Sequence, residues 1–265
     1  MDLDTFKPTF LIQIEGQDLS KDITQEITSF VFTDNEEELD VLERQALVEK
    51  HLISPLHARK SRGAAVALRP DEAVSIMINE EDHLRLQVLM PGLNLEAAWE
   101  LCSALDDALN ERLTFAFSEV RGYLTACPTN VGTGLRASVM MHLPGLVLTG
   151  QAGRVFETLG KLGMAVRGLY GEGTGAQGNL FQISNQITLG RTEEEIISHL
   201  KSVSQEILSQ ERSARERLLN ADRIKLEDRV SRAYGILTNA RTIASGEALK
   251  LLSEMRLGIV LNLLT

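Results

Sequence analysis

The sequence has little of what marks several large classes of protein. Two cysteines, Cys102 and Cys127, are too few for a disulfide framework and lack the C-x-x-C spacing of a zinc site. No apolar run is long enough to cross a bilayer, and the first residues lack the basic and apolar regions of a signal peptide. We therefore expect reduced thiols, a cytoplasmic location and no membrane contact.

Basic residues are also scarce relative to acidic ones. The chain has 27 Lys and Arg against 37 Asp and Glu, which gives a formal net charge of −10. A protein of this charge repels phosphate backbones, so we expect no direct binding of nucleic acid. Cationic protein substrates fit the charge better.

Common nucleotide-binding motifs are missing or lack their context. No Gly-Lys-Ser or Gly-Lys-Thr is present, so the sequence has no P-loop. The stretch 173–178 fits the G-x-G-x-x-G pattern, but residues 179–184 have the pattern of a strand where a dinucleotide-binding fold requires a helix. An ATP site in this chain must therefore be of another kind.

The apolar content, 43% of 265 residues, is sufficient for the core of one large domain or two small ones. From Arg44 onward, apolar runs of strand length alternate with helical segments, which predicts an α+β fold. Before that point, the pattern predicts two short strands, Thr9 to Glu15 and Thr28 to Thr33, in a hairpin-like unit.

Three longer segments show the apolar spacing of helices. Leu95 to Arg112 predicts a packing helix with an acidic outer face. Thr192 to Asn220 predicts the longest helix, with its first residue as N-cap and acidic residues in the first turn. Leu226 to Leu264 is expected to be mostly helical, with breaks at Gly246 and Gly258.

Three polar stretches stand out against this background. The segment 79–85, Asn-Glu-Glu-Asp-His-Leu-Arg, places three acids, a His and an Arg directly behind the apolar run 73–78. Two glycine-rich stretches follow, 127–136 and 167–175, and each contains an arginine. Packing does not require charges in these places, so we interpret the three stretches as parts of a chemical site.

Together these stretches resemble the guanidino kinases, which phosphorylate guanidinium groups with ATP. Within that family, residues 48–55 and 136–144 look most like the bacterial protein-arginine kinases, and the resemblance runs from about Arg44 to the C-terminus. It implies a guanidino kinase catalytic domain over residues 44–265, with an antiparallel sheet flanked by helices. It also implies ATP and Mg²⁺ as cofactors and proteins with exposed arginine as substrates. A zinc-binding activator protein and a Clp unfoldase, which degrades the marked proteins in a stress response, are the further partners implied.

The chemistry explains why such residues are needed. A guanidinium group is a poor nucleophile because it is protonated, with a pKa above about 12, and its lone pairs are delocalised. An enzyme must orient it and accept a proton, which suits a pair of carboxylates. By resemblance, Glu81 and Glu172 are this pair, and Cys127 is a reactive thiol that helps to orient the guanidinium. The plainer alternatives are a solvated acidic turn, a glycine-flanked loop and a buried inert thiol, respectively.

Phosphoryl transfer also needs positive charge around the triphosphate and its Mg²⁺. By resemblance, Arg85, Arg136 and Arg167 bind phosphate, and a surface ion pair is the alternative for any one of them. No protein ligand for a metal ion is implied. The resemblance extends the nucleotide pocket to His51, Ala137, Ser138, Val139, Met140, Gly168, Leu169, Tyr170, Gly171 and Glu172.

The chain departs from the family pattern at both ends. It has no Ser-Ser-Arg-Ile-Arg type motif ahead of the catalytic region and stops before the Arg-Asp-x-x-Arg-Ala motif, which binds phosphoarginine in full-length protein-arginine kinases. Residues 6–43 are instead similar to the opening of phage tail hub proteins of the late-control D type, which predicts a separate segment over residues 1–43. Two alternatives stay open: a phosphagen kinase acting on free arginine, and an inactive truncated or fused remnant with a binding or structural role.

Overall fold

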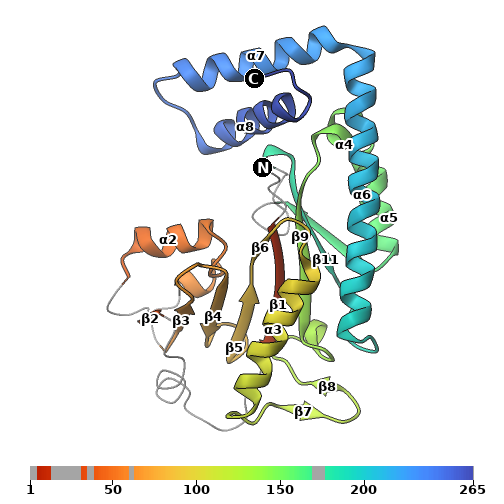
Figure 1. The fold of residues 1–265 in the computed structure, drawn as a ribbon. Coiled ribbons are helices and arrows are strands. Elements are labelled where there is room, and N and C mark those ends of the chain that lie inside the picture. Colours follow the sequence, from red (N-terminus) through yellow and green to blue (C-terminus); the bar gives the residue numbers. More distant parts are fainter. Residues whose placement is uncertain (1–4, 13–30, 35–38, 60–62, 169–176, 265) are drawn as a thin grey trace. The chain divides into compact units, whose positions relative to one another are not determined.

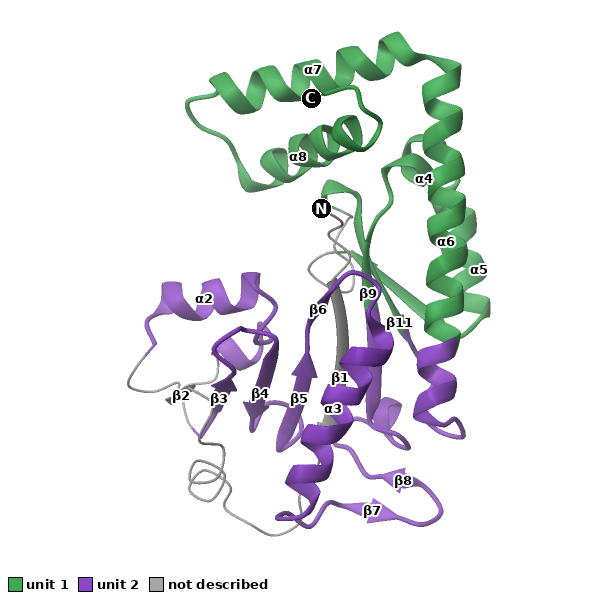
Figure 2. Ribbon diagram, in the orientation of Figure 1, with its two compact units in different colours: residues 1–4, 139–184, 199–265 green, residues 5–138, 185–198 purple. Residues whose placement is uncertain are grey.

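The computed structural model of the protein describes residues 5–12, 31–34, 39–59, 63–168 and 177–264. These residues belong to two compact units, which Figure 2 distinguishes by colour. Apart from the first four residues, unit 1 consists of residues 139–184 and 199–265, and unit 2 consists of residues 5–138 and 185–198. Helices and antiparallel strands occur together, so the predicted α+β class is confirmed.

An antiparallel sheet forms the core of unit 2, with its strands in the order β1-β5-β4-β3-β2 (Figure 1). All five side chains of β4 are buried, as are those of β5 apart from Arg85. This is the outcome expected for short continuous apolar runs. The strands are β1 (Thr5–Ile12), β2 (Val31–Asp34), β3 (Ala65–Leu68), β4 (Val74–Ile78) and β5 (Leu84–Val88).

The two N-terminal strands do not pair with each other, so the predicted hairpin-like unit is wrong. Strand β1 pairs with β5 and with the short β6 (Met90–Pro91), whereas β2 pairs with β3. Strands β3, β4 and β5 already form a meander, and β1 and β2 each cover one of its open edges. The predicted extensions to Glu15 and back to Thr28 lie outside the described residues.

Two helices belong to the N-terminal part of unit 2. Helix α2 (Val41–Glu49) starts with a capping box, in which the side chains of Asp40 and Glu43 accept each other's backbone N–H. Helix α3 (Leu95–Asn110) packs against β1 and β5, which confirms the predicted packing helix. The remaining short elements are η2 (His57–Arg59), β7 (Phe117–Ser118), β8 (Gly122–Tyr123) and η3 (Pro128–Asn130).

Three strands and most of the helices make up unit 1. Strand β11 (Leu180–Asn185) lies between β10 (Met164–Gly168) and β9 (Leu135–His142), and the start of β9 and the last residue of β11 belong to unit 2. The helical elements are α4 (Pro144–Leu148), α5 (Ala152–Lys161), η4 (Gln177–Asn179), α6 (Glu193–Ala221), α7 (Arg223–Asn239) and α8 (Ser245–Val260), of which α6 begins in unit 2.

The prediction for α6 is confirmed, and that for the C-terminal helices needs one correction. Helix α6 spans 29 residues, and Thr192 and Glu195 cap its start reciprocally at 3.2 Å. The break in the last segment falls between α7 and α8, not at Gly246 or Gly258, which both lie inside α8. A Cβ at Gly258 would collide with Cγ1 of Val230, so this glycine lets α7 and α8 pack closely. None of the described helices combines the length and apolar character needed to cross a bilayer.

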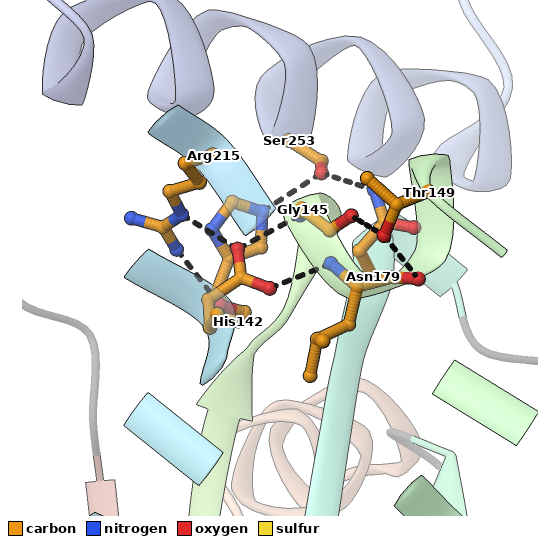
Figure 3. A network of polar contacts seen from close by, with 8 residues as sticks. His142, Gly145, Thr149, Asn179, Arg215 and Ser253 are labelled. Carbon is orange, nitrogen blue, oxygen red and sulfur yellow. Dashed lines mark hydrogen bonds and ion pairs between the residues drawn. The ribbon is translucent and has the colours of Figure 1, made fainter. Parts of the chain in front are cut away.

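A buried carboxylate fixes the turn from β9 into α4 within unit 1 (Figure 3). The Glu211 side chain on α6 accepts the backbone N–H groups of Gly145 and Leu146, each at 2.8 Å, and pairs with Arg215 at 2.6 Å. Arg215 in turn donates to the backbone oxygen of His142 at 3.0 Å. These N–H groups at a helix start have no partner within the helix, so Glu211 supplies the cap that α4 lacks in its own sequence.

Candidate active site

The acid stretch 79–85 forms the turn between two buried strands of unit 2. Ile78 at the end of β4 pairs with Leu84 at the start of β5, and the Asn79 N–H donates to the backbone oxygen of His83 at 2.8 Å. Asn79 has a φ of 55°, a left-handed conformation that asparagine tolerates better than most residues. The apolar strands therefore place the three acids together at one end of the sheet.

The three consecutive acids have different surroundings. Glu80 and Asp82 are buried, with 6% and 2% of their surfaces exposed, whereas Glu81 between them is exposed. The backbone N–H of Glu81 donates to Glu80 Oε2 at 2.8 Å. Glu81 is thus the member of the trio that is presented to solvent, on a backbone that its neighbours hold in place.

Glu80 links the acid turn to the loop that carries His51. Its Oε1 accepts a hydrogen bond from Ser54 Oγ at 2.5 Å, and Arg85 Nη1 lies 3.5 Å from Oε2. Burial by itself would raise the pKa of Glu80, but the Ser54 hydroxyl and the Arg85 charge outweigh it and lower the pKa below its ordinary value. Glu80 is therefore ionised and orients Arg85, whose side chain stays 30% exposed.

Residues 51 and 52 are held by polar side chains from β4 and β5. Gln87 Nε2 donates to the backbone oxygens of His51 and Leu52, at 2.8 and 2.9 Å, and Ser75 Oγ donates to that of Leu52. His51 itself is half-buried and has a φ of 61°. The sheet thus fixes the backbone of a predicted nucleotide-binding residue.

Asp82 links the acid turn to the loop that carries Cys127. Its Oδ1 accepts the backbone N–H of Ala126 at 2.6 Å, and burial is the main reason why its pKa is raised above the ordinary value. The half-buried Cys127 has its Sγ 3.0 Å from Thr129 Oγ1, and its backbone oxygen accepts from Thr125 Oγ1. Cys102, by contrast, is fully buried in α3.

Arg136 is oriented by the end of β11. Its Nη1 donates to the backbone oxygen of Asn185 at 2.7 Å, and the buried Asn185 side chain bonds the backbone of Ala137 and Leu135 at 2.8 and 3.0 Å. Ala137 and Ser138 are buried along β9. The sequence analysis did not single out Asn185, because nothing in its own neighbourhood signals that it clamps a strand 50 residues away.

The other predicted site residues belong to unit 1. Val139 is buried and Met140 half-buried in the second half of β9, while Arg167 is half-buried and Gly168 buried at the end of β10. Leu169, Tyr170, Gly171 and Glu172 lie outside the described residues. Unit 1 also has a groove of about 540 Å³ between α5 and α6, but no predicted site residue lines it.

A cation that accompanies a nucleotide would find no preformed cage among the side chains that the structure describes. Within the part of the chain that the structure describes, no group of three or more His, Cys, Asp or Glu side chains is arranged to hold a metal ion. The half-exposed guanidinium groups of Arg85 and Arg136 are suited to phosphate oxygens. Such a site fits a magnesium ion that is held mainly by phosphates and water.

Comparison with known proteins identifies the family. Residues 17–214 match the family model of the ATP:guanido phosphotransferase C-terminal catalytic domain, and residues 223–265 match that of the protein-arginine kinase McsB C-terminal domain. The first match begins inside the segment 1–43 that the sequence analysis set apart. The class is therefore that of phosphotransferases acting on guanidino groups.

Similar sequences narrow the class. The protein-arginine kinase of Moorella thermoacetica is 64% identical over 227 residues, which cover 86% of this chain and 65% of that protein. The corresponding kinase of Caldanaerobacter subterraneus is 51% identical over 240 residues, or 90% of this chain and 71% of that protein. The chain belongs to the protein-arginine kinase family within the ATP:guanido phosphotransferases. It spans 65% and 63% of the first two relatives that it matches, the second being from Symbiobacterium thermophilum.

Solved structures support the fold alone, because their sequences are distant. The duplicated taurocyamine kinase of Schistosoma mansoni with bound transition state analog components superposes with a TM-score of 0.69 at 21% identity, over 87% of this chain and 37% of that one. A lombricine kinase superposes with a TM-score of 0.65 at 22% identity, over 80% of this chain and 66% of that one. The guanidino kinase fold predicted for the chain is thereby confirmed.

Proposed function

We propose that this chain catalyses the ATP-dependent phosphorylation of arginine side chains in proteins. The observation that carries the proposal is the arrangement of the acid turn, in which buried Glu80 and Asp82 hold an exposed Glu81. A carboxylate in this position is open to a guanidinium group from another molecule. The family membership supports the use of ATP as phosphoryl donor.

Each proposed residue has a defined part in the reaction. Glu81, with Glu172, accepts hydrogen bonds from the guanidinium, orients it and takes up the proton that it must lose. The freed nitrogen then forms a bond to the γ-phosphorus of ATP while the bond to the ADP oxygen breaks. The products are phosphoarginine in the target protein and ADP.

The positive groups stabilise the charge that spreads over the transferred phosphoryl oxygens. Arg85, Arg136 and Arg167 bind the phosphates, and Mg²⁺ neutralises the developing charge when it is bound with ATP. Glu80 helps by fixing the direction of Arg85, since the two groups are 3.5 Å apart. Cys127 contacts the substrate guanidinium. The nucleotide contacts come from His51, residues 137–140 and residues 168–172.

The wider biological setting is carried forward from the resemblance. We expect protein substrates with exposed arginine, a zinc-binding activator protein, delivery of the marked proteins to a Clp unfoldase, and a cytoplasmic location. The phage tail hub-like start over residues 6–43, ahead of a catalytic domain over 44–265, stays an expectation from the resemblance, although β1 and β2 belong to unit 2 and the family match begins at residue 17. Assays of phosphoryl transfer to arginine do not depend on these expectations.

The decisive experiment measures phosphoarginine by mass spectrometry under non-acidic conditions, after incubation with ATP, Mg²⁺ and an arginine-rich protein. Glu81→Gln should lower the rate by about 10²–10⁴-fold, the usual contribution of a general base. Glu119→Gln is the matched control, because Glu119 is an exposed acid in the turn of the β7–β8 hairpin. Free arginine as substrate tests the phosphagen kinase alternative. A folded wild-type chain that modifies neither substrate would refute the proposal.

A further inference from the structure

The buried hydroxyl of Thr188 lies against the glycine-rich loop that carries Cys127. Thr188 is 3% exposed and follows the last residue of β11 closely. Its Oγ1 donates to the backbone oxygens of Val131 at 2.8 Å and Thr129 at 3.1 Å. Both oxygens belong to the loop between Cys127 and Arg136, and all of these residues are part of unit 2. One side chain therefore holds two points of the loop.

The backbone of Thr188 contacts the same loop. Its oxygen accepts the N–H of Thr133 at 3.1 Å, and a Cβ added at Gly132 would lie 2.4 Å from that oxygen. Gly132 also has a φ of 114°, which residues with a side chain rarely adopt. From another direction, the backbone of Tyr123 exchanges two hydrogen bonds with Gly132, at 2.8 and 3.2 Å. The loop is thus fixed between residues 123 and 188.

Thr129 connects these contacts to the thiol of Cys127. The Thr129 Oγ1 lies 3.0 Å from Cys127 Sγ, and its backbone oxygen is one of the two that Thr188 binds. Thr129 is the middle residue of the single turn η3, in which the Asn130 N–H donates to the Cys127 backbone oxygen at 3.0 Å. The turn links the thiol to the point that Thr188 holds, so a shift of that point also moves the thiol.

Arg136, at the other end of the loop, has an anchor of its own. Its Nη1 donates to the backbone oxygen of Asn185, and the Asn185 side chain bonds the backbone of Ala137 and Leu135 on both sides of the arginine. Removal of the Thr188 hydroxyl takes away none of these bonds. The two ends of the loop can therefore be disturbed separately.

We propose that Thr188 is a positioning residue for arginine phosphorylation, because its hydroxyl fixes the turn that holds the Cys127 thiol. The inference rests on the proposed function, in which Cys127 contacts the substrate guanidinium. Thr188 acts through Thr129 rather than by contact with the guanidinium, and it serves the arginine side of the reaction rather than the nucleotide side. The sequence around Thr188 does not signal this role, since its partners lie 57 and 59 residues away.

Steady-state kinetics with ATP, Mg²⁺ and an arginine-rich protein test this role. Thr188→Val removes the hydroxyl and keeps the branched shape of the side chain. It should lower kcat/KM for the protein substrate by about tenfold or more, because a small displacement of a substrate-orienting group has effects of this size. KM for ATP should stay within about twofold, since the anchor of Arg136 is intact. Thr188→Ser keeps the hydroxyl and should restore most of kcat/KM.

Thr149→Val is the matched control. The Thr149 hydroxyl also donates to two backbone oxygens, those of Gly145 and Leu146, but it follows α4 in unit 1, where no predicted site residue takes part in these bonds. This change should leave kcat/KM within about twofold. An unchanged kcat/KM in Thr188→Val, an equal loss in Thr149→Val, or no recovery in Thr188→Ser would overturn the proposal.

Alkylation of Cys127 in the folded protein is a second readout that needs no activity. Thr188→Val should raise the alkylation rate by about fivefold, the factor that corresponds to the loss of one ordinary hydrogen bond. Cys102, fully buried in α3, is the internal reference. An unchanged rate at Cys127 would refute the inference whether or not the chain is active. If the rate responds but the wild-type chain makes no phosphoarginine, the proposed function fails, and the part of Thr188 in catalysis fails with it.

Discussion

The side chain of Asp82 accepts a hydrogen bond of 2.6 Å from the backbone N–H of Ala126, 44 residues further along the chain. This bond joins the acid turn to the residue that precedes Cys127. Asp82→Ala should therefore destabilise the protein by about 0.5–1.5 kcal/mol, because it removes a partly buried hydrogen bond that joins two loops. It should also raise the alkylation rate of Cys127, with the fully buried Cys102 as reference.

Asp82→Asn separates geometry from charge at this position. The amide oxygen can still accept from Ala126, and the buried carboxylate, whose pKa is raised, is no longer present. We expect thermal stability at pH 7 equal to or above that of the wild type, and an unchanged alkylation rate at Cys127. A loss of stability in Asp82→Asn as large as that in Asp82→Ala would show that the charge of Asp82 itself is required.

Asp106 on α3 should make the protein less stable as the pH rises. Burial, followed by the charges of Asp107 and Glu193, raises the pKa of Asp106 from 3.8 to about 6. The folded state therefore holds this proton more tightly than the unfolded state, and ionisation weakens folding between about pH 4 and 6. Asp106→Asn should raise the free energy of unfolding by about 1–2 kcal/mol at pH 7 and should not change it below pH 4, allowing for solvent screening.

Denaturant unfolding at pH 4 and pH 7 measures the effect of Asp106→Asn. Glu100→Gln, an exposed change on the same helix, is the control and should alter the pH dependence little. A variant that gains the same stability at both pH values would show that ionisation of Asp106 is not the cause.

His142 should make the protein more stable as the pH rises, the opposite of the effect of Asp106. Burial, together with the charges of Arg256 and Arg215, lowers its pKa from 6.5 to about 3, so the unfolded state binds a proton that the folded state does not. Stability is fully present above pH 6.5 and decreases as the pH falls toward 3, by up to about 1.4 kcal/mol per pH unit. His142→Gln should flatten this dependence when unfolding is followed between pH 7 and 4. Parallel curves for the variant and the wild type would rule the histidine out as its source.

The carboxylate of Glu211 should be needed for the fold rather than for chemistry. It accepts two backbone N–H groups and pairs with Arg215, and a glutamine there has one oxygen fewer for these donors. Glu211→Gln should cost about 1–3 kcal/mol in denaturant unfolding. Glu216→Gln, an exposed change on the same helix, should cost much less. Equal losses of stability in the two variants would mean that the cap of α4 is not the cause.

Whether a feature can be predicted from the sequence depends on how far apart along the chain the interacting residues lie. The acid turn was predicted because it directly follows a continuous apolar run, and the start of α6 because Thr192 and Glu195 are three residues apart. The partner of β1 was not predictable in this way, since the pairing with β5 depends on which sheet edge is open. Gly258 was interpreted as a break for the same reason, because Val230 on another helix decides its role.

Within the candidate site, too, the sequence predicts residues but not the contacts that they make with distant parts of the chain. The resemblance supplied Glu81 and Arg85, but the sequence could not say that Glu80 and Asp82 point inward and Glu81 outward. That difference depends on Ser54 and Ala126, which are 26 and 44 residues away from their partners. The placement of Glu172 stays a prediction.

The alternation of inward and outward acids in the turn has a practical consequence. Because Glu80 and Asp82 maintain the turn, Glu81→Gln removes the carboxylate that we propose to act on the guanidinium, while both anchors stay in place. The variant should therefore be a well-folded capture reagent. Under the proposed function, the variant immobilised with a non-hydrolysable ATP analogue would retain arginine-bearing proteins and so reveal the targets of the chain.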